Sequence, residues 1–145
     1  YDGREQSRAA LAWAAGLARR LDGELHILSV IEPLAAAIDP VAGGVATDGM
    51  IDEVRRSREA DLQDAIASVP EGVPASGVLL EGPVAPALLP AVGDLDLLVA
   101  GSPSHGPIGQ VLTGSISRKL MDESPVPVAL VPRSAVDAEA AAPAA

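Results

Sequence analysis

The stretch VAGSPSHGPIGQVLTGSIS, residues 99–117, decides the fold of this chain. It follows an apolar segment at 95–100 that predicts a buried strand, and it leads into a helix predicted over 116–123. Open α/β sheets bind ligands outside the carboxyl ends of their strands. Glycines allow close backbone approach, and the free N–H groups of a helix start attract phosphate. The stretch therefore indicates a phosphate-binding loop, although a flexible turn with a serine cap is the alternative.

Outward from this stretch, helical and strand patterns alternate along the whole chain. Helices are predicted for the pattern Leu11–Leu21, which Gly23 is expected to close, and for 50–67, 84–92 and 116–123. Strands are predicted over 24–31, 78–80, 95–100 and 126–131, with a loop over 33–49. The alternation predicts an α/β fold, a three-layer, doubly wound parallel sheet with helices on both faces.

The start of the sequence does not fit this scheme, because a helical pattern follows the turn signal Asp2-Gly3 at once. In a doubly wound sheet the first strand is central. Without it, two neighbouring strands would leave N–H and C=O groups unpaired in the core. We therefore expect the first strand to lie upstream of Tyr1.

Composition narrows the class of protein. The 145 residues suit one domain, 48% of them are apolar, and there is no cysteine for a disulfide or a thiolate metal site. The net charge of −10 and the scattered basic residues argue against nucleic acid as a partner. The sequence shows neither a signal peptide nor an apolar run of about 18 residues. These features predict a cytoplasmic protein that does not insert into membranes.

Standard fingerprints of nucleotide enzymes are absent. Residues 109–115 have the glycine spacing of a P-loop but lack its lysine, and the dinucleotide pattern GxGxxG also fails. No catalytic triad or carboxylate pair is visible, and Ser115 has no histidine base placed by sequence. His26 and His105 have no partner at metal-ligand spacing. The sequence therefore predicts a protein that is not an enzyme, or at most a slow ATPase.

The glycine-rich stretch resembles the nucleotide motif of the universal stress protein family. That motif is a glycine, two residues, a second glycine, nine residues and then Gly-Ser or Gly-Thr. Gly101, Gly114 and Ser115 match it, whereas Ser104 stands where the second glycine is expected. The neighbouring stretches 25–30, 96–102 and 124–132 are also similar to the family. The resemblance covers residues 1–132 except the loop 33–49, so we expect a domain over 1–133 and a disordered, Ala-rich acidic tail over 134–145.

The resemblance implies a fold like that of the adenine nucleotide alpha hydrolases, with strand order 3-2-1-4-5, and a site for ATP, alone or with Mg²⁺. Asp2 matches the acid beside the adenosine, and Val30 matches the valine that lines the adenine pocket. The positions that would hold ribose and phosphates are Gly101, Ser104, Gly114, Ser115, Ile116 and Ser117. Such a domain would act as a regulatory binding module in a stress response.

The resemblance also implies a homodimer formed through the last strand, at Val126, Val128 and Leu130. Pro127 lacks an N–H group, which favours a position at the sheet edge.

Ser104 and Pro103 depart from the family pattern. If the second glycine needs φ > 0, the Cβ of Ser104 would cost about 1–2 kcal/mol, or roughly tenfold in affinity. The alternative functions are therefore a dimerisation or interaction module without nucleotide, or one domain of a tandem or larger regulatory protein.

Overall fold

The computed structural model describes residues 1–33, 48–102 and 114–132. Within them, helices and strands alternate as α1 (Glu5–Leu21), β1 (Leu25–Ile31), α2 (Asp48–Ala67), β2 (Ala75–Glu81), α3 (Val84–Ala91), β3 (Leu98–Ser102), α4 (Ser115–Glu123) and β4 (Val128–Pro132). The predicted α/β alternation is confirmed. Most of the predicted loop 33–49 and all of the tail 134–145 lie outside the described residues. None of the described helices is long and apolar enough to cross a membrane.

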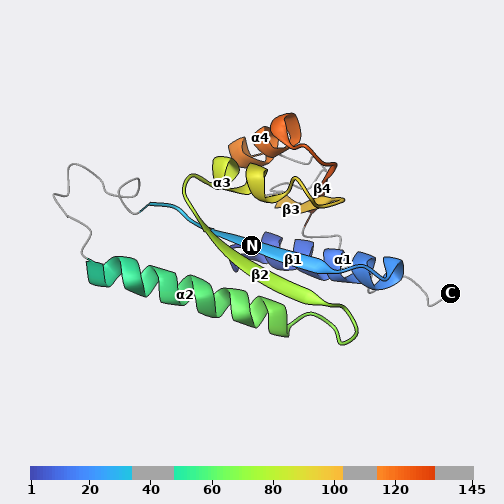
Figure 1. Ribbon diagram of the computed structural model, residues 1–145, viewed down its shortest axis with the longest axis horizontal. Coiled ribbons are helices and arrows are strands. Elements are labelled where there is room, and N and C mark those ends of the chain that lie inside the picture. The colour runs from blue at the N-terminus through green and yellow to red at the C-terminus, as the bar shows by residue number, and fades with distance from the viewer. Residues whose placement is uncertain (34–47, 103–113, 133–145) are drawn as a thin grey trace.

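The strands form two parallel pairs, β1 with β2 and β3 with β4 (Figure 1). The first pair runs from Leu25 opposite Ala75 to Ile31 opposite Glu81. The second pair runs from Leu98 opposite Val128 to Ser102 opposite Pro132. Among the described residues β1 does not pair with β3. The expected order 3-2-1-4-5 counts the strand expected upstream of Tyr1 as the first, so β1 and β2 correspond to its strands 2 and 3, and β3 and β4 to its strands 4 and 5. Both observed pairs agree with neighbours in that order, but two separate pairs do not establish it as a whole.

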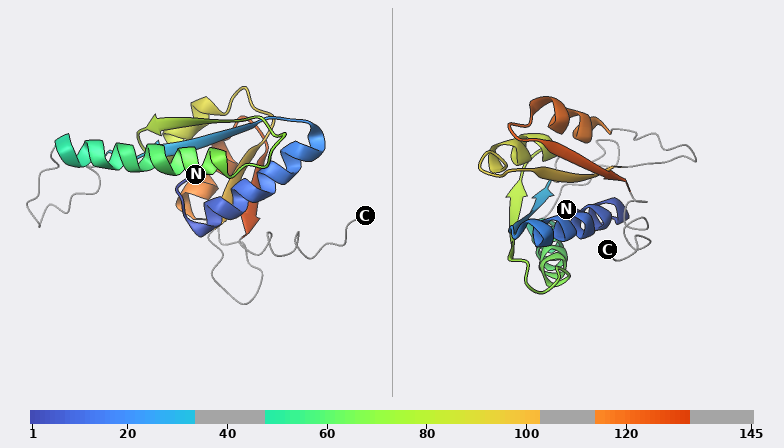
Figure 2. Two further views of the ribbon diagram at one scale, coloured as in Figure 1. Left: turned by 90° about the horizontal axis from the view of Figure 1, so that it is seen from below. Right: turned by 90° about the vertical axis from the view of Figure 1, so that its right-hand side faces the viewer.

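Helices cover the strands from both sides. Figure 2 shows α1 and α2 on one side, and α3 and α4 on the other. One core cluster comprises the buried residues Ala85, Val92, Leu98 and Leu120, which come from α3, the turn after it, β3 and α4. A second cluster comprises Ile27, Leu62 and Ala65, which join α2 to β1. Burial of these side chains is the main force that holds the helices on the strands.

The N-terminal turn, residues 1–6, includes the first two residues of α1 and links the two strand pairs. The backbone nitrogen of Tyr1 donates a hydrogen bond to the carbonyl of Leu28 on β1. On the other side, the first turn of α1 packs directly on β3, since a Cβ on Gly101 would lie 2.4 Å from the backbone oxygen of Gln6. The buried face of α1 carries only small side chains, Ala9, Ala10, Ala14 and Ala15. Small side chains on α1 and none on Gly101 allow this close approach.

Three predicted strands have wrong boundaries. The strand predicted over 78–80 already begins at Ala75 and runs to Glu81. The predicted strand 95–100 begins only at Leu98, because Leu95 closes a turn after α3 by donating its N–H to the Val92 carbonyl (3.1 Å). Val126 likewise precedes β4, and its carbonyl accepts the Ser124 hydroxyl (2.8 Å). Leu95 and Val126 nevertheless pack against the first core cluster. Their apolar character therefore reflects contact with the core rather than strand structure.

The helices differ from prediction at single residues. The last turn of α1 ends with Asp22 in the left-handed region (φ 53°), not with Gly23. Aspartate tolerates this region better than most residues. Gly23 instead donates its N–H to the carbonyl of Ala18 (2.9 Å). Near the start of α2, inside the range predicted as a helix, the apolar residue Ile51 is 43% exposed.

The contact between α1 and β3 predicts a large effect of Gly101→Ala. The added methyl group would collide with the backbone of Gln6, so we expect a loss of about 1–3 kcal/mol in the free energy of unfolding. Urea denaturation of the nucleotide-free protein measures this loss.

Gly49→Ala is the matched control, because nothing lies within 4 Å of a Cβ at that exposed helical position. Its free energy of unfolding should equal that of the parent or exceed it by up to about 1 kcal/mol. Equal stability of Gly101→Ala and the parent would contradict the packing described above.

Candidate functional site

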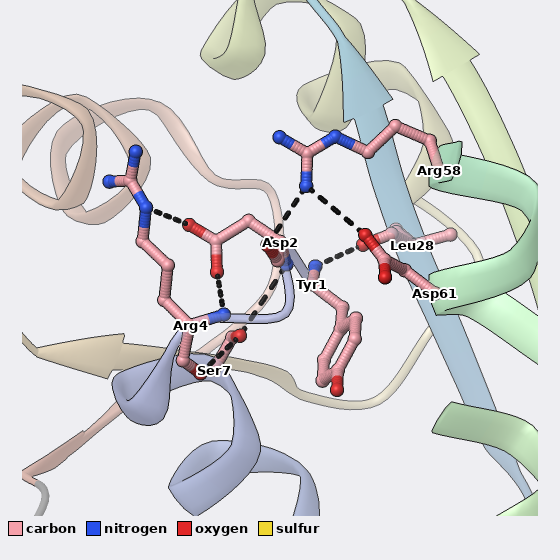
Figure 3. Close-up of polar contacts among 7 residues, drawn as sticks. All are labelled: Tyr1, Asp2, Arg4, Ser7, Leu28, Arg58 and Asp61. Atoms are coloured by element: carbon pink, nitrogen blue, oxygen red, sulfur yellow. Dashed lines mark hydrogen bonds and ion pairs between the residues drawn. The ribbon is translucent and has the colours of Figure 1, made fainter. Parts of the chain in front are cut away.

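Asp2 lies in the N-terminal turn beside β1, where contacts from several sides hold it (Figure 3). Its Oδ1 accepts the N–H of Arg4 (3.0 Å), and its Oδ2 lies 3.5 Å from the Arg4 Nε. Its own N–H donates to the Ser7 hydroxyl (3.4 Å). Its carbonyl accepts a hydrogen bond from the Arg58 guanidinium of α2 (2.8 Å). The carboxylate is thus ordered while about half of the side chain, 46%, stays exposed.

The charge state of Asp2 follows from these contacts. Burial raises the pKa of its carboxyl group. The Ser7 hydroxyl, the Arg4 N–H and the Arg4 guanidinium lower this pKa, and their combined effect is larger than that of burial. The net result is a pKa below the ordinary value of an aspartate. Asp2 is therefore an ionised hydrogen-bond acceptor at neutral pH, as a contact to a hydroxyl or amino group of a ligand requires.

Val30 is the next to last residue of β1 and stands opposite Leu80 of β2. The strand pair ends just beyond it, where the Gly82 N–H donates to the Ile31 carbonyl (3.0 Å). Gly82 has φ 128°, a conformation that side chains disfavour, and it turns the chain from β2 into α3. Val30 is half-buried at the carboxyl end of the pair.

The start of α4 has the features of an anion site. Gly114 is the N-cap with extended backbone (φ −62°, ψ 166°) and provides no side-chain cap for the first turn. An uncapped helix start leaves N–H groups and the positive end of the helix dipole for a ligand. Ser115 and Ile116 are exposed there, whereas Ser117 is only 8% exposed and faces the interior.

A cavity of about 230 Å³ joins the start of α4 to the end of β1. Its lining consists of Glu32, Pro83, Val84, Ala85, Pro86, Ser115, Ile116 and Lys119. The α3 helix also begins at this cavity, with Pro83 as an N-cap that makes no side-chain cap hydrogen bond. Two uncapped helix starts and one lysine therefore face the same space, next to the single carboxylate of Glu32. A second cavity, of about 430 Å³, lies along α2 beside Arg58 and Asp61.

The end of β3 contributes Gly101 and Ser102. Gly101 packs against Gln6, so its missing side chain serves the contact with α1. Ser102 is fully buried, and its hydroxyl has no hydrogen-bond partner within the described part of the chain. A buried hydroxyl without a partner is unfavourable by about 1–3 kcal/mol. The predicted site residue Ser104, and His105 beside it, lie outside the described residues.

Sequence reasoning missed several members of this region. Glu32, Pro83 and Lys119 line the cavity, and Arg58 contacts Asp2 across 56 positions of sequence. The predicted residues Ser115 and Ile116 line this cavity, whereas Asp2 and Val30 do not. Asp2 instead contacts Arg58, which lines the second cavity along α2. The proline after β2, at a helix start, was the one local signal that could have suggested part of this lining.

A separate group of hydrogen-bonded side chains, Glu24, His26 and Ser76, lies at the opposite, amino-terminal end of β1. The His26 Nε2 is 3.0 Å from the Glu24 Oε1, and its Nδ1 is 2.9 Å from the Ser76 hydroxyl. His26 and Ser76 are directly opposite in the strand register, so the contact supports the β1–β2 pairing. The two cavities described above have none of these three residues in their linings.

Metal ligands do not gather in the described ranges. Within 1–33, 48–102 and 114–132, no group of three His, Asp or Glu side chains could hold a metal ion.

Parallel strands whose carboxyl ends meet an uncapped helix start and a cavity define an open α/β protein with its candidate site at the usual edge. The sequence pattern of the Universal stress protein family matches residues 1–132. The chain is 32% identical over 136 residues to a universal stress protein of Thermus aquaticus, encoded in the 3' region of a QAH/OAS sulfhydrylase, with 90% of this chain and 93% of that protein covered. The chain belongs to the Universal stress protein family.

Solved structures agree with this assignment. A protein of the family from Burkholderia pseudomallei is 25% identical, with a TM-score of 0.70 and 91% of each chain covered. A universal stress protein solved in complex with cAMP is 22% identical, with a TM-score of 0.64 and 90% of this chain and 92% of the other covered. A family member from Arabidopsis thaliana with AMP bound is 18% identical, with a TM-score of 0.55 and coverage of 90% and 80%. The latter two likenesses support the fold.

The lowered pKa of Asp2 predicts a pH-dependent stability difference between the parent and Asp2→Asn. Because the folded-state pKa lies below the unfolded one, the carboxylate stabilises the fold fully above about pH 4. Its contribution is lost as the pH falls through the folded-state pKa. Urea denaturation at several pH values should therefore show an advantage of the parent at pH 7 that shrinks in acid. An advantage that grows below about pH 4 would contradict the assigned contacts.

Proposed function

We propose that this chain binds an adenine nucleotide at the carboxyl ends of its strands and acts as a regulatory binding module in a stress response. The observation that carries the proposal is the uncapped start of α4 at Gly114, which opens on the same cavity as the end of β1. Family members with cAMP and AMP bound support adenine nucleotides as the ligand class. The ligand that we favour within this class is ATP, alone or with Mg²⁺.

The described residues suit such a ligand. The N–H groups of Ser115, Ile116 and Ser117 would hold phosphate at the helix start, with Lys119 close by. The apolar end of β1 at Val30 offers a surface for the adenine ring. The ionised Asp2 offers an acceptor for adenosine hydroxyl or amino groups. The buried Ser102 hydroxyl at the end of β3, which has no partner among the described residues, also fits a polar ligand or loop at this edge. Gly101 and Ser104 would begin the loop around the phosphates.

Titration calorimetry with ATP and Mg²⁺ tests the proposal, with AMP and cAMP as further ligands. The parent should bind at least one of them at millimolar concentration or below. Gly114→Val should abolish binding, because its side chain would fill the space that a phosphate needs beside the helix start. The extended backbone at Gly114 accommodates valine, so the variant should still fold.

Gly93→Val is the matched control, because Gly93 is exposed just after α3 and its nearest neighbour is a backbone oxygen 4.0 Å from a Cβ. It should bind as the parent does. No heat with any of the three nucleotides would overturn the proposal.

A second candidate function is an interaction module without nucleotide. It is favoured by Ser104, which replaces the second glycine of the family motif. Such a module would dimerise through the edge of β4, at Val128 and Leu130, with Val126 just before the strand. Among the described strands, β4 pairs with β3 alone.

Ser104→Gly separates the two functions. If the parent binds ATP and the motif needs φ > 0 at position 104, this variant should bind about tenfold more tightly, because glycine adopts that backbone without a Cβ penalty. Calorimetry of the two proteins side by side measures the ratio. Binding by Ser104→Gly with none by the parent would favour the interaction module, while nucleotide that co-purifies with the parent would exclude it.

A further inference from the structure

Arg58 reaches the candidate site from the middle of α2. Its Nη1 donates to the carbonyl of Asp2 (2.8 Å) and lies 3.7 Å from the Oδ2 of Asp61, one turn further along the helix. Figure 3 shows the guanidinium between the N-terminal turn and Asp61. The Arg58 side chain is 33% exposed, and its contact with Asp2 lies at the protein surface beside the cavity along α2. Hydrogen bonds from a charged donor are stronger than those between neutral groups.

The other polar contacts of Asp2 come from its own segment. Arg4 and Ser7 fix the shape of the turn, because both lie within five residues of Asp2. They do not fix where the turn lies relative to the strands and α2. The Tyr1 contact with β1 and the Gln6 contact with Gly101 place the turn against the strands. The contact with Arg58 ties the backbone of Asp2 to α2, 56 positions away.

The surroundings leave room for this contact. Gly3 has φ 75° and turns the chain directly after Asp2, and a Cβ at Gly3 would lie 3.7 Å from the Asp61 Oδ2. That distance is an ordinary van der Waals contact, so glycine serves the positive φ at this position rather than the close approach. A guanidinium group can serve both the carbonyl and the carboxylate at once, because its donors form a planar fork.

We propose that Arg58 is a positioning residue for the ligand site: it holds Asp2 at the place where the Asp2 carboxylate contacts the adenosine. This inference rests on the proposed function. Arg58 acts through Asp2 and does not itself touch the nucleotide. Its removal should therefore weaken binding through loss of the Asp2 contact alone.

Arg58→Ala and Arg58→Lys, compared with the parent by ATP calorimetry, test the proposal. Arg58→Ala should weaken binding about three- to tenfold, which corresponds to the net contribution of one ordinary hydrogen bond. Arg58→Lys should recover part of the loss, since its ammonium group can still donate to the carbonyl. Both variants should fold, because Leu62 and Ala65, 4% and 1% exposed, keep α2 packed on the strands.

Arg56→Ala is the matched control. Arg56 lies on the same helix and pairs only locally with Glu53 (2.8 Å), with both side chains 68% exposed. It should leave the ATP affinity within about twofold of the parent.

A double-mutant cycle with Asp2→Ala shows whether Arg58 acts through Asp2. Arg58→Ala should cause no further loss of affinity in the Asp2→Ala background. The same loss in both backgrounds, or parental affinity of Arg58→Ala, would overturn the positioning role while nucleotide binding stands. Parental affinity of Asp2→Ala would overturn it as well. Absence of binding by the parent would overturn the proposed function, and this inference with it.

Discussion

The close approach of the N-terminal turn to both strand pairs is the constraint on which the described structure depends. On one side the turn donates a hydrogen bond to β1, and on the other it lies against Gly101 of β3. No strand pairing joins β1 to β3 within the described residues, so this turn, α1 and the first core cluster, against which Leu28 of β1 packs, carry the connection. The α1 helix extends the same contact along β3 and β4. The relative placement of the two carboxyl ends therefore depends in part on side chains that are small or absent at the contact of α1 with β3.

This constraint also places the candidate site. Asp2 belongs to the turn, and Gly101 and Ser102 belong to the strand on which the turn rests. Across the molecule, the starts of α3 and α4 meet the end of β1 at one cavity. The proposed site thus combines segments that are distant in sequence and that come from the carboxyl ends of β1 and β3, the N-terminal turn and the starts of α3 and α4. Membership in the Universal stress protein family makes an adenine nucleotide the ligand class to test first.

Much of the fold could be predicted from the sequence, because apolar runs bounded by glycine and proline mark buried elements. The true starts of β3 and β4 could not be predicted. Leu95 and Val126 contact the core from turns before these strands, and periodicity does not distinguish such a residue from a strand residue. The left-handed end of α1 also escaped prediction: the pattern indicates glycine at that position, yet Asp22 adopts it. In each case tertiary packing or local hydrogen bonding decided what the sequence period leaves open.

The site was predictable where it is continuous in sequence. Gly114 and Ser115 stand at the start of a helix, as the glycine-rich stretch indicates. Gly101 has a second role that the motif does not reveal, because its contact with Gln6 depends on folding. Arg58 and Glu32 could not be found from local patterns, since each meets the site only through the tertiary arrangement. Ser104 remains a prediction from sequence.

The central claim is that the nucleotide site lies at the carboxyl ends of the strands and includes the N-terminal turn. An amide NMR titration of ¹⁵N-labelled protein with ATP tests it most directly. The account predicts that the signals of Asp2, Val30 and Ser115 shift together with one binding curve, while those of His26 and Ser76 at the opposite end of the strands stay in place. Shifts confined to the His26 end, or shifts of Ser115 without Asp2, would contradict it.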